Sequence, residues 1–447
     1  MSDHDSQIPP PHPDAGGDDH GPAKTDLTPE QVFELLKAGK PIVNARIKRL
    51  KFRGEIPYKV EFRNCTLIAM QFDAATFAEP VRFINCTMER PQFDRKCVFE
   101  KTLDFGGSSL NKAVLSGLVV KESFNCPRTE FKGKLTFANC EFHGKASFWE
   151  AKFLCWTDIK KCKFHAEADF RSVHCDQGFV MTSSVFHDDF LFRGSNVEKK
   201  FQADTCTFEK RLDLSKAKLH DFCYLEGIVQ GPEMRFAFEN ALATRILVRP
   251  EQVEGRLASE VAGDHKVAMN EYGLLKKCYQ EQHRFDQEDW AFYRFKVNQR
   301  RSKPVSLWRP WTAWRTFADW LFLDIGCGYG TNPARAIRTA VLIILGFAVL
   351  YAVRVDLFYT EKPPFPPDIP AGSDEMQVKA LNKDAAQGMG NRIMIGLITS
   401  VSVFTSGMGG IREIAQGWMN VPVMVESIMG TLLFGLFIVA FSRKVIR

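Results

Sequence analysis

Large apolar residues recur every five or six positions between about residues 55 and 222. The repeating residues are Phe62, Leu67, Phe72, Phe77, Phe83, Met88 and Phe93 in a first run, then Phe137, Phe142, Phe148, Phe153, Ile159, Phe164, Phe170, Cys175, Met181, Phe186, Phe192, Val197, Phe208, Leu214 and Leu219. Strands alternate every two residues and helices every 3.6, so neither period explains this spacing. The pattern therefore predicts a repeat structure, not ordinary strands or helices.

A small residue stands two positions before many of these large ones. The small residues are Cys65, Ala75, Cys86, Cys140, Ala146, Ala151, Cys162, Ala168, Ser184 and Cys206. A chain that turns a corner every five residues sends one small and one large side chain inward on each side. Four sides make one turn, and the turns stack at the inter-strand spacing. We expect about eight coils and a rod on the order of 40 Å long.

This rhythm resembles the pentapeptide-repeat family, whose fold is a right-handed quadrilateral β-helix. The resemblance implies such a β-helix over residues 55–245, preceded by a short helix and N-terminal cap over 26–54. The rhythm weakens near 105–131, where Gly106, Gly107, Gly117 and Pro127 predict an irregular coil. The first 25 residues are polar and rich in Pro, Gly and Asp, which predicts a disordered tail without a signal peptide.

The twelve cysteines show no paired metal-ligand spacing. We interpret Cys65, Cys86, Cys97, Cys140, Cys162 and Cys206 as small core residues. The outward histidines His143, His165, His174 and His187 are interpreted as surface residues. We therefore expect no metal site, no cofactor and, since no nucleophile–base pair is apparent, no enzyme. The net charge is only +6, and bases and acids nearly balance along the repeats, which argues against nucleic acid as a partner.

Residues 258–303 change to a helical pattern. Tyr272, Leu275 and Tyr279 share one helical face, and Trp290 and Val297 share another. Two interpretations stay open for this segment. It is either a hairpin that caps the β-helix or a cytoplasmic coupling element next to a membrane.

The rest of the chain predicts a membrane domain. Residues 304–330 begin with Trp308, Trp311, Trp314 and Trp320 beside two arginines, as an amphipathic helix at a membrane interface would. Residues 334–358 predict a first transmembrane helix and residues 422–442 a second, with an extracytoplasmic loop over 359–390. Basic clusters flank both spans on one side, which predicts a multi-pass protein of the inner (plasma) membrane with both termini in the cytoplasm.

The stretch LFLDIGCGYGT, from Leu321 to Thr331, resembles motif I of the methyltransferases that use S-adenosylmethionine. Such a motif should open a βαβ unit. Here the helix that follows is apolar all round, as a membrane span is. We therefore interpret CGYGTNP, residues 327–333, as a Gly-rich turn in which Pro333 begins the first span.

Within residues 391–413, the stretch 393–411 carries no charge and contains Gly407, Gly409 and Gly410 near its end. Together with the two spans, this segment resembles the two-transmembrane cation channels of the potassium-channel type. The resemblance implies a pore helix followed by an ion filter, which is formed by Thr405, Ser406, Gly407, Met408 and Gly409. Glu426 and Gly430 match the inner helix of that family. A third full span is the competing interpretation of this segment.

The resemblance implies a homotetrameric channel for a monovalent cation, K⁺ or Na⁺, in the lipid bilayer, with Gly430 or Gly435 as the gating hinge. The filter departs from the family pattern because Ser406, Met408 and Gly410 replace Val, Tyr and Asp, which predicts weak potassium selectivity. The β-helix would regulate or anchor the channel, with a cytoplasmic protein as a possible partner. The alternative is a membrane-tethered pentapeptide-repeat scaffold that binds a protein partner without conduction.

Overall fold

The computed structural model describes residues 24–94, 96–303, 310–354, 388–406 and 417–445. The chain divides into two compact units, Met1–Ala243 and Thr244–Arg447, and each is described by itself. Almost all of the expected N-terminal tail and of the loop over 359–390 lies outside the described residues.

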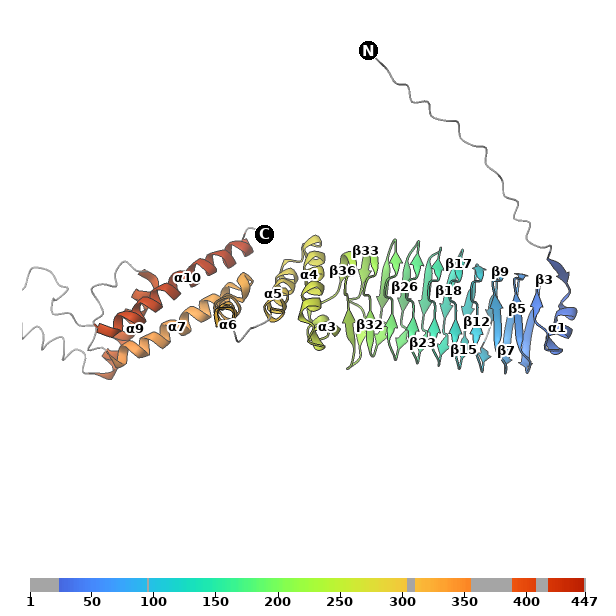
Figure 1. Cartoon of the computed structure of the whole chain (residues 1–447), viewed down its shortest axis with the longest axis horizontal. Coiled ribbons are helices and arrows are strands. Elements are labelled where there is room, and N and C mark those ends of the chain that lie inside the picture. Colours follow the sequence, from blue (N-terminus) through green and yellow to red (C-terminus); the bar gives the residue numbers. More distant parts are fainter. Residues whose placement is uncertain (1–23, 95, 304–309, 355–387, 407–416, 446–447) are drawn as a thin grey trace, which may run out of the picture. The chain divides into compact units, whose positions relative to one another are not determined.

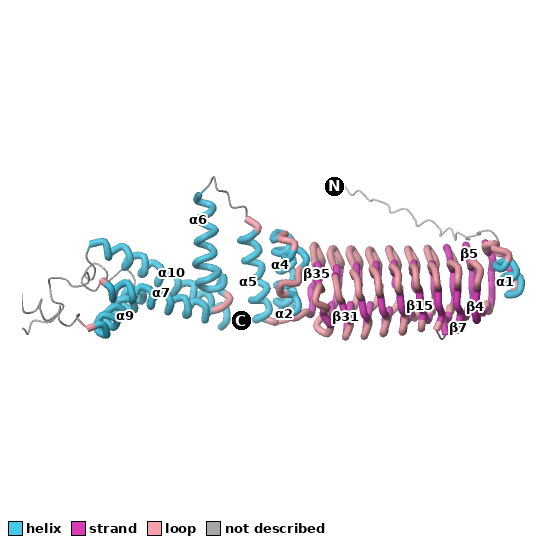
Figure 2. Tube along the Cα trace, turned by 90° about the horizontal axis from the view of Figure 1, so that it is seen from below, coloured by secondary structure: helices cyan, strands magenta, loops and turns pink. Residues whose placement is uncertain are grey.

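The first unit is a parallel β-solenoid of ten turns (Figures 1 and 2), because one face is a ten-stranded sheet with one strand from each turn. The strands of this face are β2 Ile42–Val43, β5 Val60–Arg63, β8 Val81–Ile84, β12 Leu103–Asp104, β16 Phe124–Asn125, β20 Ala146–Ser147, β24 Ala168–Asp169, β28 Phe190–Leu191, β32 Arg211–Asp213 and β35 Arg235–Ala237. Helix α1, Pro29–Lys37, lies at the N-terminal end and begins with a capping box on Thr28.

The other faces form one continuous set of 26 strands. They are β1 Thr25–Leu27, β3 Ala45–Lys48, β4 Lys51–Ile56, β6 Thr66–Ile68, β7 Gln71–Phe77, β9 Thr87–Glu89, β10 Gln92–Asp94, β11 Cys97–Phe99, β13 Ser109–Asn111, β14 Val114–Ser116, β15 Leu118–Val120, β17 Glu130–Lys132, β18 Leu135–Ala138, β19 Glu141–Phe142, β21 Lys152–Phe153, β22 Thr157–Lys160, β23 Lys163–Phe164, β25 His174–Cys175, β26 Phe179–Thr182, β27 Val185–Phe186, β29 Asn196–Val197, β30 Phe201–Asp204, β31 Thr207–Phe208, β33 Lys218–Tyr224, β34 Val229–Gln230 and β36 Leu242–Leu247.

The core confirms the inward positions. Every large and every small residue assigned to the interior from the sequence is buried, and so is Cys97. Parallel pairing places Phe142, Phe164, Phe186 and Phe208 one above another at a step of 22 residues. The centroids of successive rings in this column lie 4.9, 4.8 and 4.9 Å apart. Stacked phenylalanines therefore form a continuous apolar interior.

Three expectations about the solenoid are corrected. It has ten turns, not about eight, and its first strands lie before residue 55, within the segment expected to be only a cap. The expected irregularity over 105–131 is absent, since β13 to β17 pair in regular register there. Gly107 adopts a left-handed conformation at a corner where Asn85 and Arg128 of the neighbouring turns do the same, so the glycine serves a regular corner. A register shift occurs instead at Arg53/Gly54.

The second unit is helical. Its elements are α2 Pro250–Val253, α3 Ala258–Val261, α4 His265–Glu281, α5 Phe285–Arg301, α6 Pro310–Ala318, a π-helical turn Asp319–Ile325, a 3-10 turn Gly328–Gly330, α7 Pro333–Val353, α9 Met389–Ser406, a 3-10 turn Gly417–Met419 and α10 Asn420–Val445. The helices α4 and α5 form the hairpin expected over 258–303, with Tyr272, Leu275, Tyr279 and Val297 buried.

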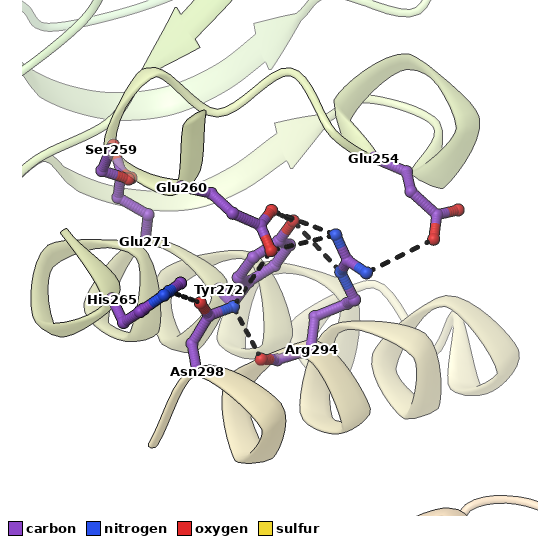
Figure 3. A network of polar contacts seen from close by, with 8 residues as sticks. All are labelled: Glu254, Ser259, Glu260, His265, Glu271, Tyr272, Arg294 and Asn298. Carbon is purple, nitrogen blue, oxygen red and sulfur yellow. Dashed lines mark hydrogen bonds and ion pairs between the residues drawn. The ribbon is translucent and has the colours of Figure 1, made fainter. Parts of the chain in front are cut away.

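A polar network joins α3, α4 and α5 (Figure 3). The Arg294 guanidinium donates to both carboxylate oxygens of Glu260 at 3.0 Å, and the Tyr272 hydroxyl donates to the same carboxylate at 2.7 Å. Asn298 donates to Glu260 at 3.4 Å and pairs with His265 at 2.9 Å. Burial raises the pKa of Tyr272, so the phenol remains a donor in this network. The network fixes the hairpin as one rigid element.

Candidate functional site

Two helices of the second unit are long and apolar enough to cross a membrane, α7 and the first 23 residues of α10. Helix α9 is apolar but shorter. Of the apolar window in α7, only 17% is buried in the structure, and the exposed side chains include Val341, Leu342 and Leu345. A core helix of a soluble protein would be largely covered, so these helices indicate membrane association.

Helix α9 runs antiparallel to α7. Gly396 lies against the backbone of Ala348, and the Ser400 hydroxyl lies 2.9 Å from the Ile344 carbonyl oxygen. Further along α9, Phe404 lines a small cavity of about 170 Å³ together with Ala340. Residues with increasing numbers along α9 therefore contact residues with decreasing numbers along α7. Helix α9 lies along most of the length of α7.

Helix α10 runs parallel to α9. Ser400 contacts Glu426, and one turn further along both helices Phe404 contacts Gly430. The start of α10 lies at the end of α7, because the Arg354 guanidinium sits 5.4 Å from the ring centre of Trp418. The contact at Gly430 is ten residues past the start of α10, or about 15 Å along the helix axis. The end of α9 and the start of α10 are thus at different positions along the axis of α10.

A buried carboxyl group lies where the three helices meet. Glu426 of α10 is fully buried, and the Tyr351 hydroxyl of α7 donates to it at 2.5 Å. The Ser400 hydroxyl of α9 is also within hydrogen-bond distance of the Glu426 carboxyl. A buried ionisable group between apolar helices is costly unless it is hydrogen-bonded, so this cluster of Tyr351, Ser400 and Glu426 fixes the helix arrangement.

Two glycines allow the helices to approach closely. A side chain at Gly396 would collide with the Ala348 carbonyl of α7, and one at Gly430 would collide with the Phe404 carbonyl of α9. Small residues at such positions let helix backbones touch. Gly435, the other residue expected to act as a hinge, has open space around it, and α10 is continuous through both glycines.

The structure describes two of the five residues expected in the filter. Thr405 is exposed in the last turn of α9, and its hydroxyl donates to the Val401 carbonyl of the same helix at 2.7 Å. Ser406 is the last residue of α9. The remaining filter residues, Gly407, Met408 and Gly409, lie outside the described residues.

The stretch from Leu321 to Thr331 is π-helical through Ile325 and then forms the expected Gly-rich turn, a 3-10 turn over Gly328–Gly330, before α7 begins at Pro333. Within it, Asp324 accepts a hydrogen bond from Tyr293 at 2.8 Å and pairs with Arg300 at 2.8 Å, both on α5. The Tyr329 hydroxyl lies 3.4 Å from Arg300, and burial raises the pKa of that phenol. These contacts, together with the Arg335 guanidinium over the Tyr293 ring, join α5 to the base of α7, and we refer to them as the joint cluster.

Helix α6 has the character expected of an interfacial helix. Trp311, Trp314, Phe317 and Trp320 are all exposed at three-residue steps on and just after α6, with Arg315 also exposed. An aromatic face with an arginine suits the headgroup region of a bilayer.

Sequence reasoning did not identify Ser400 and Tyr351 as partners of Glu426. Tyr351, near the end of α7, is buried against α10. The signal that was available is a lone acidic residue, Glu426, in an apolar span, which requires donors from other helices. No protein-family model matches the chain, and no curated protein matches it.

Proposed function

We propose that the protein is a tetrameric membrane cation channel whose β-solenoid is a cytoplasmic domain that regulates or anchors it. Each chain contributes α7 and α10 as spans and α9 as the pore helix. The permeant ion is K⁺ or Na⁺, and both termini lie in the cytoplasm.

The direction of α9 carries this proposal. Because α9 is antiparallel to α7 and parallel to α10, the chain has to return about 15 Å between the end of α9 and the start of α10. A helix that enters from one side and a segment that returns to that side make a re-entrant loop, the arrangement that supports an ion filter. Non-helical backbone at membrane depth is stable only where protein or water surrounds it, as in a pore.

The filter assignment rests on position. Thr405 and Ser406 end α9, and Gly407, Met408 and Gly409 come next in the sequence. Glycines allow backbone carbonyl groups to point toward an ion. The bracing tyrosine of selective potassium filters is replaced by Met408, so we expect K⁺ and Na⁺ to pass at comparable rates.

In a tetramer, neighbouring copies would cover apolar side chains of α9 that a single chain leaves exposed. Six large apolar side chains in the described part of α9 are exposed in the single chain, namely Met389, Ile393, Met394, Leu397, Ile398 and Val401. A pore helix lies inside the assembly, so these residues would contact neighbouring subunits. The tetramer therefore gives this face a protein partner and places four filters on one axis.

A second candidate function is a membrane-tethered solenoid scaffold that binds a protein partner and does not conduct. The degenerate filter favours this candidate, because Ser406, Met408 and Gly410 all depart from the selective pattern.

Ion flux separates the two candidates. The purified protein would be reconstituted in liposomes, and uptake of K⁺, Na⁺ and N-methylglucamine would be compared. The channel predicts that K⁺ and Na⁺ pass and that N-methylglucamine does not. Gly407→Ala should abolish flux without changing the assembled mass, whereas Gly346→Ala, at an open position on α7, should leave flux unchanged.

Topology and mass complete the test. A reporter fused after residue 447 should be cytoplasmic if α9 is re-entrant and extracytoplasmic if α9 is a third span. The mass in detergent should correspond to four chains of 50.8 kDa. A monomer with no flux and an extracytoplasmic C-terminus would reject the channel.

A further inference from the structure

Three histidines form a column on the outer surface of the solenoid. His143, His165 and His187 follow β19, β23 and β27, and each lies one turn of 22 residues after the previous one. The rings of His143 and His165 are 4.7 Å apart and 5° from parallel, and those of His165 and His187 are 4.9 Å apart and 10° from parallel. From the sequence, these histidines were expected only to be surface residues. The solenoid places their rings in contact.

A carboxylate lies beside the first two histidines. Glu141 and His143 point to the same outer face of β19, because Phe142 between them points inward. The Glu141 Oε1 atom is 2.9 Å from Nε2 of His165 and 3.9 Å from Nε2 of His143. One donor atom from each of Glu141, His143 and His165 lies within 4.8 Å of the others.

We propose that Glu141, His143 and His165 form a zinc-binding site on the solenoid, independent of the proposed channel function. Two imidazoles and one carboxylate are a ligand set that Zn²⁺ prefers, with water in the open position. Ligands at about 2.1 Å from a tetrahedral ion are roughly 3.4 Å from each other. The two distances from Glu141 bracket that separation.

The backbone positions the ligands, and their exposure allows the side chains to rotate. The amide of His143 donates to the Val120 carbonyl at 2.9 Å, and the amide of His165 donates to the Phe142 carbonyl at 2.8 Å, so neither Cα can move freely. A metal ion lies in the plane of each imidazole that binds it, and therefore the two parallel rings must turn toward each other. The side chains are 44% and 34% exposed, which leaves room for that turn.

The charges around the site have opposing effects on the binding of a cation. The hydrogen bond from His165 and the nearby positive charges hold the pKa of Glu141 below its usual range, so the ligand is a carboxylate at neutral pH. Lys163 pairs with Glu141 in register on the next turn and repels a cation. His187, the next ring in the column, lies outside the trio and is paired with Glu209 at 3.0 Å.

Cobalt spectroscopy tests the site. The full-length protein in detergent, without an affinity tag and stripped of metal, would be titrated with Co²⁺ and then with Zn²⁺. We expect one Co²⁺ per chain, visible d–d absorption without a thiolate charge-transfer band, and displacement by Zn²⁺. All twelve cysteines are buried, so a thiolate band would assign the binding elsewhere and overturn the proposal.

Matched variants test whether Glu141, His143 and His165, and not His187, form the metal site. His143→Gln and His165→Gln should each weaken binding by more than about tenfold, and His187→Gln should not change it. Lys163→Gln should strengthen binding, a gain that misfolding does not produce. Unchanged affinity in both trio variants, or no saturable binding by the wild-type protein, would overturn the site. Neither result depends on ion flux, so failure here leaves the channel proposal untouched.

Discussion

Removing the hydroxyls that face Glu426 tests whether this buried carboxyl fixes the packing of α7, α9 and α10. Hydrogen bonds to charged groups contribute about 1.5–3 kcal/mol in soluble proteins. Measured values between membrane helices average about 0.6 and reach about 1.7 kcal/mol. The Tyr351 hydroxyl donates to Glu426 at 2.5 Å in a fully buried location, so we expect Tyr351→Phe to lower the free energy of unfolding by about 1.5 kcal/mol.

Ser400→Ala should cost less than Tyr351→Phe. The Ser400 hydroxyl has a single hydrogen and two acceptors, the Glu426 carboxyl and the Ile344 carbonyl, so its contribution to Glu426 is divided. We expect a loss of about 0.6 kcal/mol. The double variant removes both hydroxyls from the carboxyl and should cost at least about 1 kcal/mol more than the sum of the two losses.

The assay is equilibrium unfolding of the purified protein in mixed micelles, with the fraction of denaturing detergent increased and helix content followed by circular dichroism. Thr431→Ala is the matched control, because its hydroxyl donates to the Ser427 carbonyl of the same helix at 3.0 Å. The control should stay within about 0.5 kcal/mol of the wild type. A neutral Tyr351→Phe variant, or strictly additive losses, would refute a shared cluster.

Three further predictions concern the solenoid, the joint cluster and the glycines. Phe148→Asp places a charge in the phenylalanine interior and should remove the cooperative β-sheet melt in circular dichroism; an unchanged melt would show that the inward register is wrong. Asp324→Asn leaves Arg300 without its carboxylate and should cost about 3 kcal/mol locally, seen as faster hydrogen exchange in the turn before α7; unaltered exchange would contradict this. Gly430→Ala should lower the thermal stability of the assembly, whereas Gly435→Ala should alter only gating; equal effects on stability would remove the packing role.

The solenoid was predictable from the sequence because its interior repeats. Each turn buries the same kind of side chain at the same place. The 22-residue spacing of Phe142, Phe164 and Phe186 therefore predicts one stacked column from the sequence alone. The prediction of an irregular coil around Gly107 was wrong, because a left-handed corner of this solenoid is occupied by glycine, asparagine or arginine alike. A change of residue type at a corner therefore does not imply a change of backbone.

The membrane site was only partly predictable, because its contacts join residues far apart in the chain. Both candidate spans were identified from the sequence, whereas the hydrogen-bond partners of Glu426 were not. The sequence does not say which of several serines and threonines on α9 faces α10. That choice depends on the level at which α9 crosses its neighbours, and Gly396 and Gly430 set this level through close backbone contact.

The Gly-rich turn shows how one sequence pattern serves different ends in different contexts. Gly328, Tyr329 and Gly330 are consecutive residues in the left-handed region, which reverses the chain within three residues. In a cofactor-binding fold such a turn brings backbone toward a ligand. Here it brings Asp324 and Tyr329 to Arg300 of α5, so that buried charged contacts join the helical hairpin to the start of α7. If the solenoid regulates the pore, we expect Asp324→Asn to uncouple regulation while ion flux itself persists, because the substitution removes the ion pair of the joint cluster.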